Sequence, residues 1–280
     1  MTTPEKVLEK CPDLTTLPMV YHKLNEAIQS PSCTTGIISR IISHDPILTM
    51  KVLKMVNSAF YGFPHEIEDI PQALLIIGMQ QLNDLVLANT VIKLFEKQKV
   101  KIFTMDDFWR YSLASGLTSK ILASCSKDRH SERVFVAGLI NAVGKLIMAI
   151  AEPEMFEKAF NLSIEKEIPS YVAEKEVFGF DHQEMNLTVM QSWSLPHSLT
   201  DIAGNILTPD NSQEHQKEAH LIGLASTICH SLKIGSCGTY FIPEIPVNTW
   251  EMTSLQPGII DEVVISLKNQ YHDILNTFLN

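Results

Sequence analysis

Apolar residues recur at spacings of three and four along almost the whole of this 280-residue chain. That spacing places apolar side chains on one face of an α-helix, whereas a half-buried strand needs strict alternation of apolar and polar residues. No convincing alternating run lies between turn signals anywhere in the sequence. We therefore predict an all-α fold.

The chain length favours about two domains, at roughly 150 residues per domain. The polar, basic segment 96–101 separates an N-terminal group of short helices from the rest. We predict an N-terminal helical subdomain over residues 1–100 and a helical bundle over residues 101–280. The expected helices cover 17–28, 35–42, 46–56, 70 to the break at Gly78, 80–95, 104–124, 131–150, 153–165, 171–178, 181–193, a short one from Pro196, 213–232 and 257–279. Residues 235–246 form the longest irregular region.

Three helix starts carry specific capping signals. Asp45 precedes Pro46, so the aspartate can cap while proline takes the first helical position. Thr104 is followed three residues later by Asp107, and Asp181 by Glu184. Both spacings are typical of a side chain that accepts from free backbone amides at a helix start.

Charge and cysteine content limit the classes of partner and compartment. The chain has 22 Lys and Arg against 32 Asp and Glu, a net charge of -10, which argues against nucleic acid as the main partner. Its five cysteines are far apart and odd in number, as expected for reduced thiols. The N-terminus lacks the pattern of a secretory signal, and no run of 18 uncharged apolar residues occurs. We expect a soluble, cytoplasmic protein without membrane association.

A series of short motifs resembles the HDOD family, which is related to the HD superfamily of metal-dependent phosphohydrolases. The motifs are Leu17-Pro18, Ser43-His-Asp-Pro46, the stretch from Lys51 to Gly62, Ala73 to Gly78, Phe108-Trp109, Gly138 to Lys145 and Glu176 to His182. Each motif is weak alone. Their order and spacing over roughly residues 13 to 235 carry the resemblance.

The resemblance implies a signal-transduction output module, made of an N-terminal helical subdomain and a degenerate HD bundle. In bacteria such modules are often attached to receiver or cyclic-dinucleotide turnover domains, and this sequence shows none. We therefore expect the input to arrive by binding, from signalling protein partners or from a nucleotide ligand.

The resemblance also implies where metal ligands would stand in an HD enzyme. The expected first-helix His falls on Tyr111, the His-Asp pair on Asn141 and Ala142, and the late Asp on Ser226. An alanine methyl group cannot bind a cation, and an uncharged amide is a weak substitute for imidazole or carboxylate. We expect no bound metal, no cofactor and no catalytic residue at these positions.

Two pairs of motif residues allow both a structural and a binding interpretation. Asp181 and His182 fit a helix start. Alternatively, His182, Asn141 and Lys145 line a vestigial anion or nucleotide pocket. Asn141 and Lys145 are four residues apart on one predicted helix, so their side chains can reach a shared ligand. Asn57 and Ser58 fit a helix end before Gly62, with Phe60 and Tyr61 packing, or a partner-docking surface.

Three functions remain open from the sequence. The favoured one is a non-catalytic regulatory binding module. The alternative is a metal-dependent phosphohydrolase, acting on nucleotides or cyclic dinucleotides, with a relocated metal site. A nucleotide sensor without hydrolysis is the third. His215, His220 and His230 do not favour the enzyme, since spacings of five and ten do not align side chains on one helix face.

Overall fold

The computed structural model describes residues 2–58 and 61–279, and this part of the chain contains helices and no strand. The predicted all-α class is confirmed. Ala59 and Phe60 of the motif that ends at Gly62 lie outside the described residues, so the predicted packing of Phe60 stays a prediction.

The chain divides into two compact units. Unit 1 comprises Met1–Thr16 and Phe95–Val264, and unit 2 comprises Leu17–Leu94 and Ile265–Asn280. The predicted division at residue 100 differs from this arrangement, because each unit includes a segment from the opposite side of that boundary. Hydrophobic periodicity identifies helices but does not show which of them pack together.

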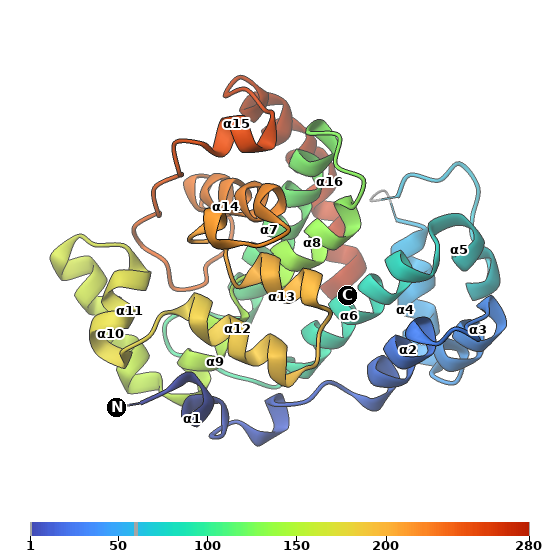
Figure 1. Cartoon of the computed structure of the whole chain (residues 1–280), viewed down its shortest axis with the longest axis horizontal. Helices are drawn as coiled ribbons and strands as arrows, with labels where there is room; N and C mark the ends of the chain where they lie inside the picture. Colours follow the sequence, from blue (N-terminus) through green and yellow to red (C-terminus); the bar gives the residue numbers. More distant parts are fainter. Residues whose placement is uncertain (1, 59–60, 280) are drawn as a thin grey trace. The chain divides into compact units, whose positions relative to one another are not determined.

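Unit 2 contains five consecutive helices and the larger, C-terminal part of a sixth (Figure 1). They are α2 (Met19–Gln29), α3 (Thr35–Ser43), α4 (Pro46–Val56), α5 (Ile70–Ile77), α6 (Met79–Leu94) and the end of α16 (Ile259–Leu279). The first five lie within two residues of their predicted bounds. Asp45 caps α4 as expected, accepting from the backbone N–H groups of Ile47 and Leu48 at 3.0 Å. Gly78 ends α5 with a φ of 85°, a conformation that glycine adopts without strain.

Unit 1 is a larger helical bundle that contains the candidate site. Its helices are α1 (Pro4–Leu8), α7 (Met105–Cys125), α8 (Ser131–Ile140), α9 (Val143–Ala151), α10 (Pro153–Lys166), α11 (Ser170–Phe178), α12 (His182–Ser192), α13 (His197–Ala203), α14 (Gln216–Ser231), α15 (Thr249–Thr253) and the start of α16, with 3-10 turns at Pro12–Leu14 and Pro209–Asn211. Helix α7 packs against α8 and α14, and α9 packs against α12. The short helices α1 and α15 were not predicted.

The predicted single helix over 131–150 is wrong, because the chain breaks at Asn141 and Ala142. The backbone N–H of Gly144 donates to Asn186 Oδ1 of α12 at 3.1 Å. A Cβ atom at Gly144 would lie 2.2 Å from the carbonyl oxygen of His182. Helix α9 therefore begins in close contact with α12, directly after the break at Asn141 and Ala142.

The start of α14 also differs from its prediction, at Gln216 instead of Gln213. The backbone N–H groups of Gln213 and Glu214 donate to the carboxylate of Asp201 at 3.3 Å, and Ser212 Oγ donates to it at 2.7 Å. A carboxylate from another helix thus holds these residues outside the helix.

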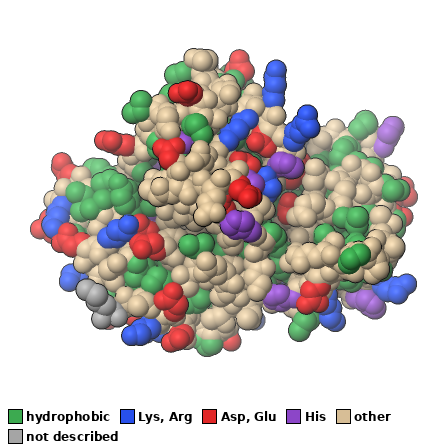
Figure 2. Space-filling view, in the orientation of Figure 1, with side chains coloured by type: hydrophobic (Ala, Val, Ile, Leu, Met, Phe, Trp, Pro, Cys, Tyr) green, Lys and Arg blue, Asp and Glu red, His purple; other side chains and the backbone are tan. Residues whose placement is uncertain are grey.

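Among the described residues, the segment Ser131–Ala151 is long and apolar enough to span a membrane by length and composition. It is interrupted at Asn141 and Ala142, and 83% of its most apolar window is buried inside the structure. The interior helices of a folded bundle have the same composition. Acidic and basic side chains are interspersed on the molecular face shown in Figure 2.

Candidate functional site

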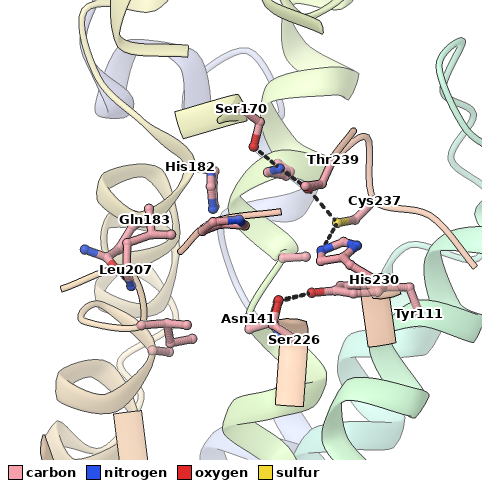
Figure 3. Close-up of a pocket in the computed structure, with 15 residues that line it drawn as sticks. Tyr111, Asn141, Ser170, His182, Gln183, Leu207, Ser226, His230, Cys237 and Thr239 are labelled. Atoms are coloured by element: carbon pink, nitrogen blue, oxygen red, sulfur yellow. Dashed lines mark hydrogen bonds between the residues drawn. The ribbon is translucent and has the colours of Figure 1, made fainter. Parts of the chain in front are cut away.

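The four positions aligned with HD metal ligands come together in unit 1. One pocket is lined by all four: Tyr111 from α7, Asn141 and Ala142 from the break between α8 and α9, and Ser226 from α14 (Figure 3). Tyr111 Oη and Ser226 Oγ share a hydrogen bond of 2.8 Å. Ser226, whose alignment is the least certain on sequence, therefore lies beside the other three.

The polar atoms at these positions bond to one another and to the backbone. Asn141 Nδ2 donates to Ser115 Oγ at 2.7 Å and to the carbonyl oxygen of Gly138 at 2.6 Å. Tyr111 Oη donates to Asn141 Oδ1 at 3.5 Å. Burial raises the pKa of Tyr111 well above its ordinary value of 10, so its oxygen stays a phenol and offers no negative charge. The donor set does not fit a divalent cation, which needs anionic oxygens, thiolates or imidazoles.

A buried lysine next to these positions forms an ionic network. Lys145 is only 2% exposed, and its Nζ lies 3.6 Å from Glu174 Oε1 of α11. The same Nζ donates to Ser170 Oγ at 2.7 Å and to the hydroxyl of Thr239. Glu174 Oε2 also accepts from the backbone N–H of His182 at 2.9 Å and bonds to His182 Nδ1 at 2.5 Å. Lys145 therefore already has a carboxylate partner.

The environment of Glu174 keeps its carboxylate ionised. Burial by itself raises the pKa of this group, but the positive charges of His182 and Lys145 and the hydrogen bonds from His182 together lower the pKa to about 2. A buried charge requires such compensation, since an unpaired carboxylate in the interior is costly. Glu174 thus neutralises the cationic side of the pocket.

His230 also lines the pocket, beside Tyr111 and Cys237 (Figure 3). Its ring stacks on the ring of Tyr111, with centroids 4.6 Å apart and an interplanar angle of 21°. Burial first, and then the positive charges of Lys145 and His182, lower the pKa of His230 to about 3. The imidazole is therefore neutral at physiological pH.

The irregular segment 235–243 crosses the pocket and supplies part of its lining. The backbone N–H of Ser236 donates to the carbonyl oxygen of Asp107 at 3.0 Å. At Gly235 a Cβ atom would lie 2.2 Å from that same oxygen, so only glycine permits this approach. Cys237, Thr239 and Pro243 then line the pocket, and Thr239 bonds Lys145. The segment is a packed strap along residues 235–239.

The space left inside the pocket is small, with a volume of about 40 Å³. A buried water needs about 10–15 Å³ on this measure, whereas pockets for drug-sized ligands occupy roughly 300–1,000 Å³. The pocket has room for a few waters and none for a nucleotide unless the strap moves.

The other sequence-predicted residues have local partners. Asp181 caps α12 in a full capping box with Glu184, and its carboxylate lies 3.0 Å from Lys175 Nζ. Asn57 and Ser58 line a separate groove within unit 2. Asn57 exchanges two hydrogen bonds with the backbone of Ile67, at 2.7 and 2.8 Å. The capping interpretation thus has direct contacts for Asp181, and for Ser58, whose Oγ donates to the carbonyl oxygen of Met55 at 2.6 Å. Asn57 instead ties the end of α4 to the segment before α5. A binding role for these residues stays a prediction.

Lys145, Asn141 and His182 do line the same pocket, although Lys145 is in α9 and Asn141 lies just after the end of α8, so the two do not share one helix. His215 and His220 have other partners: His215 Nδ1 lies 3.1 Å from Glu218, and His220 bonds Thr249 and Asp210. Within residues 2–58 and 61–279, no three His, Cys, Asp or Glu side chains are placed to hold a metal ion together.

Sequence reasoning missed Glu174 and the strap residues Cys237 and Thr239. Glu174 stands eight residues before His182, and no local pattern separates it from the exposed glutamates nearby. Its burial at 2% exposure and its contacts with Lys145 of α9 and His182 of α12 depend on tertiary packing, which the sequence alone does not give.

Comparison with known proteins shows similarity to chains from several bacteria. A crystal structure of an HDOD domain protein of unknown function from Geobacter sulfurreducens has a TM-score of 0.76 and 20% identity, covering 94% of this chain and 93% of that one. The structure of a Shewanella amazonensis protein, provisionally named a phosphohydrolase, has a TM-score of 0.75 and 22% identity, covering 99% of this chain and 98% of that one. A Marinobacter aquaeolei protein, provisionally named a signal transduction protein, has a TM-score of 0.72 and 17% identity over 94% and 59%.

A curated relative, an uncharacterized protein of Treponema pallidum, is 25% identical over 194 residues, which are 68% of this chain. This chain covers 37% of the length of that relative. The sequence pattern of the HDOD domain matches residues 14–208, well over half of the chain. The chain therefore belongs to the HDOD domain family.

Proposed function

We propose that this HDOD protein is a non-catalytic module of signal transduction, which binds signalling proteins and does not hydrolyse phosphoesters. The observation that supports this most directly is the set of hydrogen bonds among the aligned ligand positions. Tyr111, Asn141 and Ser226 bond to one another or to the backbone, and Ala142 has no donor atom. An HD-type mechanism needs about three strong donors and an open position for water.

The similar proteins are consistent with either a signalling or a hydrolytic role, because the Marinobacter protein is provisionally named for signal transduction and the Shewanella protein for phosphohydrolysis. Identities near 20% carry the fold only. The acidic balance of this chain favours protein partners over nucleic acid.

The test is a phosphodiesterase and phosphatase assay against cyclic dinucleotides and nucleoside phosphates, with Mg²⁺, Mn²⁺ and Fe²⁺ supplied in turn. No turnover above that of the heat-denatured protein is expected. Metal-dependent turnover that disappears with chelator would refute the proposal. Elemental analysis of the purified protein provides a second measurement, since near-stoichiometric Fe, Mn or Zn supports the alternative of a relocated metal site.

A nucleotide-sensing role requires the strap to leave the pocket, because the present volume of about 40 Å³ does not admit a base and a phosphate. Thermal unfolding with and without each nucleotide distinguishes this function. A ligand that binds only the folded state raises the melting temperature. If no nucleotide raises the melting temperature, the nucleotide-sensing role is refuted.

A further inference from the structure

Residues 239–247, which continue from the strap, are here called the lid segment. They supply Thr239 and Pro243 to the lining of the pocket in unit 1, whereas Val247 is 97% exposed. In the part of the chain that the structure describes, no backbone–backbone hydrogen bond involves residues 240–245. Segments with an unbonded backbone are among the least stable parts of a fold. The lid segment thus covers the pocket without being tied to the bundle through the backbone of these residues.

The far end of the lid segment is fixed to the bundle. Thr249 begins α15, and its hydroxyl bonds to His220 Nδ1 of α14 at 2.9 Å. Asn248 Nδ2 donates to Asp210 Oδ1 at 2.8 Å, and the same carboxylate oxygen lies 3.2 Å from His220 Nε2. His220 is only 1% exposed, so these contacts reach into the core of unit 1. The chain from Asn248 onward is therefore held independently of the lid segment.

The near end is held by the strap and then turns at a glycine. The backbone N–H of Ser236 donates to the carbonyl oxygen of Asp107 at 3.0 Å. Gly238 follows with a φ of 78°. Glycine adopts this conformation without strain and has access to more backbone conformations than any other residue. Gly238 is thus a suitable hinge, because hinges are a few loop residues that absorb a change in φ and ψ.

A side-chain contact between these two ends holds the lid segment over the pocket. Thr239 Oγ1 accepts a hydrogen bond from the buried Nζ of Lys145, and it lies 3.5 Å from Cys237 Sγ (Figure 3). Lys145 retains Ser170 and Glu174 as partners when Thr239 moves away. Water admitted by the opening takes the third position on Nζ. The movement therefore leaves no unpaired buried charge, which would be costly.

We propose that the lid segment is a gate, which opens by rotation at Gly238 while its far end stays fixed at Thr249. The hydrogen bond from Lys145 to Thr239 is the latch that keeps it closed. Opening removes Thr239 and Pro243 from the pocket lining and gives solutes access to Lys145. Such a gate supplies the movement that a nucleotide sensor needs, and any other solute would require the same opening.

Alkylation of the native cysteines by iodoacetamide measures this opening. Cys237 is 2% exposed and its thiol contacts Thr239, so the reagent reaches it only when the lid segment opens or unit 1 unfolds. Cys229 is 0% exposed, in α14, and reports unfolding alone. Cys125 is exposed and reports the activity of the reagent. Tryptic cleavage after Lys233 places the two buried cysteines on different peptides, and mass spectrometry then gives the rate at each.

In the folded full chain we expect Cys237 to react at least about tenfold faster than Cys229, because local opening is more frequent than unfolding. Urea at up to about 1 M should accelerate the reaction of Cys229 and change that of Cys237 little, since a local opening exposes little surface. Equal rates with equal urea dependence would mean that the lid segment moves only when unit 1 unfolds. That result would overturn the proposal.

Variants of Thr239 test the latch. Thr239→Val removes the hydroxyl at nearly constant volume and should raise the rate at Cys237 about tenfold or more, with Cys229 unchanged. Thr239→Ser keeps the hydroxyl and should react like the wild type. Burial raises the pKa of Cys237, while Lys145 and the Thr239 hydroxyl lower it. Loss of the hydroxyl without opening would therefore slow the alkylation and not speed it.

The matched control is Thr188→Val, which removes a hydroxyl that bonds within α12 and should change neither rate. No acceleration in Thr239→Val, or the same acceleration in Thr239→Ser, would overturn the proposal. If Cys229 is accelerated equally in Thr239→Val, that variant is unfolding, and the wild-type comparison of the two cysteines decides. The test uses no nucleotide and no phosphoester, so its failure is distinguishable from failure of the proposed non-catalytic function.

Discussion

Acid should destabilise unit 1 through His230, and the His230→Phe variant should remove this sensitivity. The folded environment lowers the pKa of His230 from 6.5 to about 3. An imidazole with a depressed pKa binds its proton more readily in the unfolded chain, so protonation favours unfolding. The neutral His230 contributes its full stabilisation above pH 6.5, and this part of the unfolding free energy is lost progressively as the pH falls from 6.5 towards 3.

The expected size of the effect follows from that interval. Each pH unit below 6.5 lowers the unfolding free energy by about 1.4 kcal/mol, as long as the imidazole stays neutral in the folded state. Between pH 7.5 and pH 5.0 the wild type should therefore lose about 2 kcal/mol more unfolding free energy than His230→Phe. Phenylalanine keeps a flat ring against Tyr111 but does not titrate in this range.

Urea unfolding at the two pH values, followed by tryptophan fluorescence, measures this difference. The three tryptophans, Trp109, Trp193 and Trp250, all belong to unit 1, so the signal reports the unit that contains His230. The exposed His197, changed to Phe, is the matched control and should leave the wild-type pH dependence in place. The reasoning is refuted if wild type and His230→Phe lose the same free energy between pH 7.5 and 5.0.

Three further variants test the contacts around the pocket. Glu174→Gln should leave the Lys145 charge without its carboxylate and lower the unfolding free energy by about 3–5 kcal/mol, as measured by thermal unfolding. The Lys145→Met/Glu174→Gln double variant should lose less than the sum of the two single losses, because it leaves no unpaired charge. A loss equal to that sum would contradict the ionic coupling. Gly144→Ala should cost about 1–3 kcal/mol or more, because its Cβ would lie 2.2 Å from the His182 carbonyl oxygen; an unchanged urea midpoint would contradict the close approach of α9 to α12. Asp181→Ala should remove the capping box and cost about 1 kcal/mol, and a Tm equal to that of the wild type would show that this cap is dispensable.

Helices with clear caps and breakers could be placed from the sequence. The α4 bounds follow from Asp45 and Pro46, and the end of α5 from Gly78, because these signals act within a few residues. The break between α8 and α9 could not be predicted, since Asn141 and Ala142 interrupt no periodicity. Directly after this break, the backbone N–H of Gly144 donates to Asn186 of α12, which lies 42 residues later in the chain.

The candidate site was predictable in its outline and not in its electrostatics. Family resemblance placed Tyr111, Asn141 and Ser226 in one alignment, and the structure brings them into one pocket. The partner of Lys145 could not be inferred, because a glutamate in a polar helix is usually exposed. Glu174 is buried and paired with Lys145 by contacts between helices that are distant in sequence.

Unit 2 is built from two segments of the chain, and the second of them is synthesised last. Helix α16 contributes Leu267, Ile274 and Leu275 as buried residues, and Lys54 Nζ donates to the carbonyl oxygen of Asn276 at 2.7 Å. Residues 17–94 leave the ribosome long before this helix does. They must wait, incompletely buried, while residues 95–264 of unit 1 are synthesised, so loop closure over most of the chain precedes their final packing. Exposed apolar surface promotes aggregation, so we expect the nascent N-terminal helices to be most prone to aggregate during this interval.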